Sequence, residues 1–147
     1  YEGREMDIPL SELGVEQSVS LGRWFKFQPL KPTVIFTSPY LRTAESARLI
    51  AENAKLKNVE IIHDERIRER ELGIFDRLTW LGSVQKFPKE CAKREQIGKF
   101  YYRPPGGESW CDVALRVRNF WRDLCLQQAE EKILIVTHEV VIRVFRY

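Results

Sequence analysis

The chain has 147 residues, enough for one domain with a substantial core, and its 44% hydrophobic and 31% charged residues are ordinary for a soluble globular protein. The net charge is only +3 and basic residues alternate with acidic ones, which argues against nucleic acid as a partner. No apolar run approaches the roughly 18 residues that span a bilayer, so no membrane partner is expected.

The cysteines and histidines do not form a metal-binding pattern. Cys91, Cys111 and Cys125 are widely spaced, and only His63 and His138 are available to join them. We therefore expect no metal and no cofactor. Free thiols that are buried or half-buried, in a reducing cytoplasm, are the simpler interpretation.

The first half of the chain alternates helical and strand patterns. Residues 11–25 predict a helix, and the β-branched and aromatic run at 34–36 predicts a buried strand. A second helix should follow directly, with Ser38 as its N-cap and Pro39 at its first position. Alanines that recur every three or four residues give this helix a small-residue face for packing on a sheet.

The second half repeats the alternation. Residues 59–62 predict a strand, and residues 88–98 predict a helix. Ser109 should begin the longest helix, with Asp112 in a capping-box position three residues later. The fully apolar run at 133–136 predicts a strand buried on both faces of a parallel sheet. The order of elements predicts an α/β fold, a three-layer sandwich with a mostly parallel sheet flanked by helices.

Polar residues follow two of these strands where ligands bind in open α/β sheets. Ser38 ends the first strand, Arg42 lies near the start of the next helix, and His138 follows the last strand. If these strands are neighbours, a guanidinium, an imidazole and free helix N–H groups meet, which suits a phosphate. A solvated arginine and a structural histidine are the alternatives, so spacing alone predicts only an anion site.

Five segments, in order along the whole chain, resemble motifs of the histidine phosphatase superfamily, to which cofactor-dependent phosphoglycerate mutases belong. Each is weak alone, but five in the same order are specific. Two departures are Ser46 where the family has Thr and Glu139 where it has Gly. The segments are 7–14 (D-x-P-L-T-x-x-G in the family), 37–47 (S-x-L-x-R-x-x-x-T-A), 67–73 (L-x-E-x-x-x-G), 106–116 (G-E-S-x-x-D-x-x-x-R) and 136–143 (V-x-H-G-x-x-I-R).

The family's Arg-His-Gly triplet, which carries the nucleophilic histidine on the first strand, does not occur in this sequence. The resemblance places it just before Tyr1. We therefore interpret residues 1–147 as a single domain that lacks its first strand and, because the sequence stops at Tyr147 within an apolar pattern, its C-terminal end. His63 matches no family motif and is interpreted as structural or exposed. A degenerate relative without a nucleophile is the alternative.

The resemblance implies a phosphoglycerate-mutase-like fold and a metal-independent phosphatase that hydrolyses a phosphate monoester through a phosphohistidine. By this resemblance Arg42, His138 and Glu69 are catalytic, and Arg42, His138 and Ser38 bind the phosphate. Glu69 would protonate the leaving group. The arginines at 66, 68 and 70 should lower its pKa, the wrong direction for an acid, so bound phosphate dianion would have to reverse the shift.

A phosphoglycerate-type mutase and a non-catalytic phosphate-binding module are the alternatives. Family mutases usually carry a longer insertion between the acid and the closing histidine, and the compact stretch 70–137 favours a phosphatase. The expected partner is a small phosphorylated substrate of unspecified identity, and a homodimer is left open. The aromatic side chains of residues 77–102 could line a ligand, but we expect most to fill the core.

Overall fold

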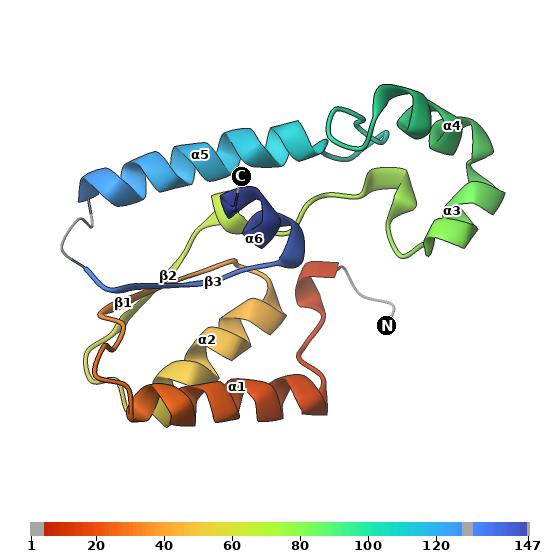
Figure 1. The fold of residues 1–147 in the computed structure, drawn as a ribbon. Helices are drawn as coiled ribbons and strands as arrows, with labels where there is room; N and C mark the ends of the chain where they lie inside the picture. Colours follow the sequence, from red (N-terminus) through yellow and green to blue (C-terminus); the bar gives the residue numbers. More distant parts are fainter. Residues whose placement is uncertain (1–4, 128–130, 147) are drawn as a thin grey trace.

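A computed structural model describes residues 5–127 and 131–146 and places a three-stranded parallel sheet between two layers of helices (Figure 1). Strands β1 (Val34–Thr37), β2 (Glu60–His63) and β3 (Ile133–Val136) lie in the order β2-β1-β3. Thr37 pairs with His63 on one side and with Val136 on the other. All three strands therefore end at the same edge of the sheet.

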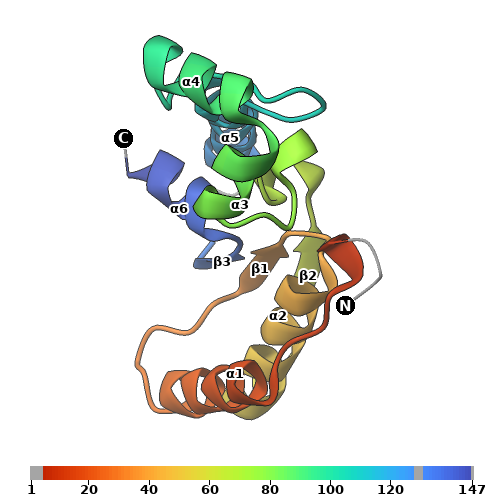
Figure 2. The same cartoon turned by 90° about the vertical axis from the view of Figure 1, so that its right-hand side faces the viewer.

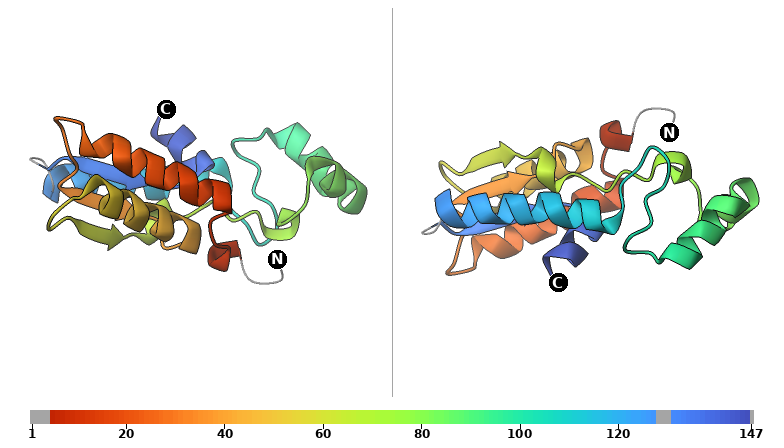
Figure 3. Two further views of the ribbon diagram at one scale, coloured as in Figure 1. Left: turned by 90° about the horizontal axis from the view of Figure 1, so that it is seen from below. Right: turned by 90° about the horizontal axis from the view of Figure 1, so that it is seen from above.

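Helices cover both faces of the sheet, which confirms the predicted three-layer α/β architecture. Helices α1 (Glu12–Lys26) and α2 (Leu41–Ala54) lie on one face, and α5 (Trp110–Gln127) and α6 (Glu139–Phe145) lie on the other (Figure 1). The short helices α3 (Trp80–Lys86) and α4 (Pro88–Ile97) extend beyond the carboxyl edge of the sheet (Figures 1 and 3), and seen from that edge they lie on the same side of the sheet as α5 (Figure 2). Within the described residues, 3-10 turns are found at Glu5–Asp7, Glu65–Ile67 and Gly73–Phe75.

The central strand β1 divides the core in two because successive side chains point to opposite faces. Val34 and Phe36 join a cluster with side chains of α5 and α6, including the fully buried Val141. Ile35 instead packs with Ala47 and Ala51 of α2, so the small-residue face of this helix lies on the sheet as predicted.

Helices α1 and α2 approach so closely that a side chain is excluded at Gly22. A Cβ there would lie 2.7 Å from Asn53 Cβ and 2.8 Å from the carbonyl oxygen of Ile50. This contact fixes α1 across α2 rather than on the sheet itself.

The capping box of α5 is formed as the sequence predicts. The Ser109 N–H donates to Asp112 Oδ2 at 2.8 Å, and the Asp112 N–H donates to Ser109 Oγ at 3.1 Å. This reciprocal pair satisfies two main-chain donors at the start of the longest helix.

Three local expectations were wrong. Helix α2 begins at Leu41 with Tyr40 as its N-cap, because the backbone of Tyr40 is extended (φ −64°, ψ 137°), although Ser38 Oγ accepts from the Tyr40 N–H at 3.3 Å. Strand β3 is half-buried along its whole length, because in the described chain it lies at an edge of the sheet with β1 as its neighbour. Cys125 is exposed, because it lies on α5 next to the buried Leu124 but points away from the core.

No helix in residues 5–127 or 131–146 combines the length and the apolar character needed to cross a membrane.

Candidate active site

The shared carboxyl edge of the strands brings together residues that are far apart in the sequence. Ser38 directly follows β1, and Arg42 lies in the first turn of α2. Glu69 lies on the segment after β2, and His138 is the N-cap residue of α6, two residues after the end of β3. The four candidate residues named by the sequence therefore lie around one edge of the sheet.

His138 is buried and bonded through both ring nitrogens. Its Nε2 lies 2.8 Å from Ser38 Oγ, and its Nδ1 lies 3.3 Å from Arg42 Nη2. An arginine can only donate, so Nδ1 accepts and the ring proton lies on Nε2, from where it is donated to Ser38. Burial first, and then the charges of Arg42 and Arg116, lower the pKa of His138 to about 3. The imidazole is therefore neutral in the free protein.

The low pKa of His138 predicts a loss of stability in mild acid. The unfolded chain takes up this proton near pH 6.5 and the folded chain only near pH 3, so the free energy of unfolding should fall as the pH falls below 6.5. Urea unfolding at about pH 5 should give about 2 kcal/mol less stability from this group than at about pH 7.

His138→Gln is the matched comparison for this pH effect. It keeps a buried polar side chain but removes the titration, so its stability should depend less on pH than that of the wild type. Glu69 has a raised pKa and contributes in the opposite sense in both proteins. Identical pH dependence in the two proteins would refute the neutral buried imidazole.

Arg42 is held in place by stacking and by two bonds to one residue. Its guanidinium carbon lies 4.9 Å from the centroid of the Tyr40 ring, which also makes an edge contact with His138 at 4.9 Å. Its Nη1 donates to the main-chain oxygen of Glu5 at 3.0 Å, and its Nη2 donates to Glu5 Oε1 at 3.1 Å. The guanidinium is therefore oriented before any ligand binds.

Glu69 points toward His138 from the loop after β2. Its Oε1 accepts a hydrogen bond from the main-chain N–H of Arg70 at 2.8 Å, and its Oε2 lies 3.7 Å from His138 Nδ1. The loop is also tied to β3, because Thr137 Oγ1 donates to the carbonyl oxygen of Ile67 at 2.6 Å. The acid candidate and the histidine are thus fixed relative to each other.

The expectation that neighbouring arginines lower the pKa of Glu69 was wrong. Burial is the largest influence and raises its pKa, and it outweighs the hydrogen bond from the Arg70 N–H and the charges of Arg42 and Arg116, which lower it; the charge of Glu5 raises it. The flanking cations act elsewhere: Arg66 binds Asp64 and Asp123. A raised pKa is what a general acid requires, and it exists here without a bound phosphate.

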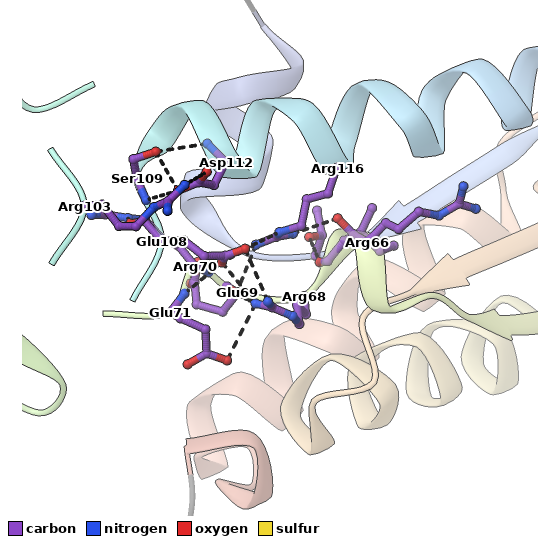
Figure 4. A network of polar contacts seen from close by, with 12 residues as sticks. Arg66, Arg68, Glu69, Arg70, Glu71, Arg103, Glu108, Ser109, Asp112 and Arg116 are labelled. Carbon is purple, nitrogen blue, oxygen red and sulfur yellow. Dashed lines mark hydrogen bonds and ion pairs between the residues drawn. The ribbon is translucent and has the colours of Figure 1, made fainter. Parts of the chain in front are cut away.

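A network of two arginines and one carboxylate supports the Glu69 loop (Figure 4). Arg68 Nη1 and Arg116 Nη2 both donate to the main-chain oxygen of Glu69, at 3.1 and 3.2 Å. Both guanidinium groups also bind Glu108, with four N–O distances between 3.0 and 3.2 Å. Arg116 additionally donates to the carbonyl oxygen of Arg66 at 2.7 Å.

The segment after this loop packs directly on the loop that leads into α5. Gly73 has a φ of 56°, and a Cβ there would lie 2.1 Å from the carbonyl oxygen of Pro105. Leu72 and Gly107 form an isolated antiparallel bridge at the same place. Only glycine fits this position, which brings Glu108 to the arginines.

His63, Glu139 and the aromatic residues of 77–102, which the sequence analysis also considered, make no contact with the candidate site residues among the described contacts. His63 is exposed at the end of β2. Glu139 is 72% exposed and pairs with Arg143 one helical turn away, so it does not face His138. Of the aromatic residues in 77–102, Tyr102 is buried as expected, but Trp80, Phe100 and Tyr101 are exposed.

Sequence reasoning missed Glu5, Tyr40 and Glu108 as neighbours of the candidate site. Glu108 lies in the G-E-S motif, which could have drawn attention to it, but a motif does not show which cations a carboxylate meets. Glu5 had no such indication, because its contact with Arg42 spans 37 positions.

The fold and the site together define an α/β protein with an arginine, a neutral histidine and a half-buried carboxylate at the carboxyl ends of parallel strands. The sequence matches the family model of the histidine phosphatase superfamily (branch 1) over residues 2–147. The chain belongs to this superfamily, which confirms the resemblance seen in its motifs.

Relatives include both phosphatases and mutases. The chain is 34% identical to the fructose-2,6-bisphosphatase TIGAR of Xenopus tropicalis, over 88% of this chain and 45% of that protein. It is 32% identical to 2,3-bisphosphoglycerate-dependent phosphoglycerate mutase 2 of Gloeobacter violaceus, over 93% of this chain and 62% of that protein. The chain therefore spans about half to three-fifths of the length of these relatives.

Solved structures agree with this assignment. YhfR of Bacillus stearothermophilus superposes with a TM-score of 0.80 at 28% identity, over 95% of this chain and 66% of that one. The mycobacterial glucosyl-3-phosphoglycerate phosphatase superposes with a TM-score of 0.77 at 27% identity, over 97% of this chain and 69% of that one. These likenesses confirm the phosphoglycerate-mutase-like fold.

Proposed function

We propose that this protein is a metal-independent phosphatase that hydrolyses a small phosphate monoester through a phosphohistidine. The observation that carries the proposal is the cluster of Arg42, His138, Ser38 and Glu69 at one edge of the sheet. The nucleophilic histidine is assigned to a segment outside this sequence, on the strand where the family carries Arg-His-Gly. A cytoplasmic location goes with this proposal.

Each residue has a defined part in this mechanism. Arg42 binds two phosphate oxygens with its planar fork, where charge spreads in phosphoryl transfer. His138, neutral in the free protein, gains a proton when the phosphate dianion arrives and then donates to a third oxygen. Ser38 holds the Nε2 side of the imidazole, so that Nδ1 is the nitrogen that faces Arg42 and Glu69.

Glu69 completes both halves of the reaction. Its raised pKa favours the protonated form, from which it delivers a proton to the leaving alkoxide as the P–O bond breaks. The resulting carboxylate then takes a proton from the water that attacks the phosphohistidine. The cationic groups neutralise the phosphate, so the mechanism uses no metal.

Turnover of an aryl phosphate by the full-length protein, including the segment to which the nucleophile is assigned, in the presence of a chelator tests this function. We expect Arg42→Ala to lower kcat/KM by about 10²- to 10³-fold, because it removes a preorganised donor to the transferring phosphoryl group. Arg48→Ala on the same helix is the control, since Arg48 is 57% exposed and pairs only with Glu52 among the described contacts. Absence of metal-independent turnover of any ester in a broad panel would refute the phosphatase.

A mutase is the second candidate, because a mutase is among the relatives at 32% identity. The same preparation should be given 3-phosphoglycerate with a catalytic amount of the bisphosphate. Isomerisation that is faster than hydrolysis would identify a mutase. Phosphate binding without either reaction would identify a non-catalytic module.

A further inference from the structure

Glu5 binds both terminal nitrogens of Arg42, the arginine that binds phosphate in the proposed mechanism. Glu5 accepts from Arg42 Nη1 through its main-chain oxygen at 3.0 Å and from Nη2 through its carboxylate at 3.1 Å. Phosphate recognition by arginine uses the same two donors in parallel. A phosphate that accepts hydrogen bonds from both Nη1 and Nη2 of Arg42 therefore competes with Glu5 for these two nitrogens.

The ion pair is partly shielded from water, so its charge matters more than that of a surface pair. The Glu5 and Arg42 side chains are 28% and 24% exposed, whereas the surface pair Arg48–Glu52 is 57% and 54% exposed. Glu5 lies in the 3-10 turn before α1, which approaches the carboxyl edge of the sheet from outside (Figure 1). The negative charge of Glu5 also raises the pKa of Glu69.

The turn that carries Glu5 lies outside the core, and the segment after it is bonded to α2 only further along, where the Leu10 N–H donates to Glu45 Oε2 at 3.1 Å. None of the three residues of the turn is buried, and the turn is joined to α1 by a segment without regular structure. The carboxylate can leave Arg42 while α1 stays packed on α2. A displaceable carboxylate on an anion-binding arginine acts as a built-in competitor.

We propose that Glu5 is an internal competitor for phosphate, which occupies Arg42 in the free protein and is displaced when a phosphate monoester binds. This inference rests on the proposed role of Arg42 in phosphate binding. Free inorganic phosphate, which has no other group to contact the protein, has to displace Glu5 with no further gain. Glu5 therefore lowers the affinity of the site for inorganic phosphate, whereas an ester that displaces Glu5 at the same cost can gain affinity from contacts of its organic group.

The test is calorimetric titration of inorganic phosphate into the protein at low ionic strength. Glu5→Gln keeps the size of the side chain and the main-chain acceptor but removes the competing charge. We expect it to bind phosphate about tenfold more tightly than the wild type. Glu52→Gln is the matched control: it also removes one carboxylate from an Arg–Glu pair, about 15 Å along α2 from Arg42, and should bind like the wild type.

Three results would overturn the inference in distinguishable ways. Binding that is unchanged or weaker in Glu5→Gln, with wild-type binding that is lost in Arg42→Ala, would mean that Glu5 only positions Arg42 and would leave the phosphatase proposal standing. Equal tightening in Glu5→Gln and Glu52→Gln would reduce the effect to net charge. No phosphate binding by any of the proteins would overturn both the competitor and the proposed site.

Discussion

Glu69→Gln is expected to lower kcat for an alkyl phosphate ester by about 10²- to 10⁴-fold and to affect a nitrophenyl phosphate much less. An alkoxide needs a proton in order to leave, and Glu69 is the half-buried carboxyl beside His138 whose pKa is raised. A nitrophenolate leaves without help. The measurement is kcat for a pair of esters that differ in the pKa of the leaving group.

The pH profile gives a second measure of the same role. The reaction needs the protonated form of Glu69, so the wild-type rate for the alkyl ester should fall as the pH rises through the raised pKa. This limb should be missing in Glu69→Gln. Glu71→Gln is the control, because Glu71 lies two residues away but is 49% exposed. Equal losses for both esters would show that Glu69 is not the acid.

The positions of Ser38 and His138 at the strand ends could be predicted, because each closely follows an apolar run that can be seen in the sequence. The apolar runs before Ser38 and His138 fix where these residues lie, and a parallel sheet then brings them to one edge. The capping box of α5 is equally local. Glu69 was different: it lies in a charged run, and only the family motif distinguished it from Glu71.

Contacts between distant residues could not be predicted in this way. The sequence pattern does not show that Arg68 meets Glu108, forty positions away, or that Arg66 binds Asp123. The pKa of Glu69 therefore shifts in the direction opposite to the prediction, because burial exceeds the effect of cations that are occupied elsewhere. Half-burial of β3 was missed for a similar reason, since burial depends on neighbours rather than on the strand's own residues.

Glu108→Ala is expected to lower the free energy of unfolding by about 3 kcal/mol, because it leaves two partly buried guanidinium groups without their carboxylate. The Glu108 and Arg116 side chains are 15% and 14% exposed, and Arg68 is 26% exposed. For a chain of this size the loss should lower Tm by about 10 °C. Urea unfolding and a thermal melt both measure it.

Glu52→Ala supplies the comparison, because its pair with Arg48 is more than half exposed and should contribute at most about 0.5 kcal/mol. The two variants also show whether Glu108 only stabilises the fold or also helps to position Glu69. Arg68 and Arg116 bind both Glu108 and the Glu69 main chain, so loosening them should lower the alkyl-ester rate more than the nitrophenyl rate. A stability loss no larger than that of Glu52→Ala would mean that the arginines find other acceptors. A large stability loss with the same fall in rate for both esters would mean that the network supports the fold without positioning the acid.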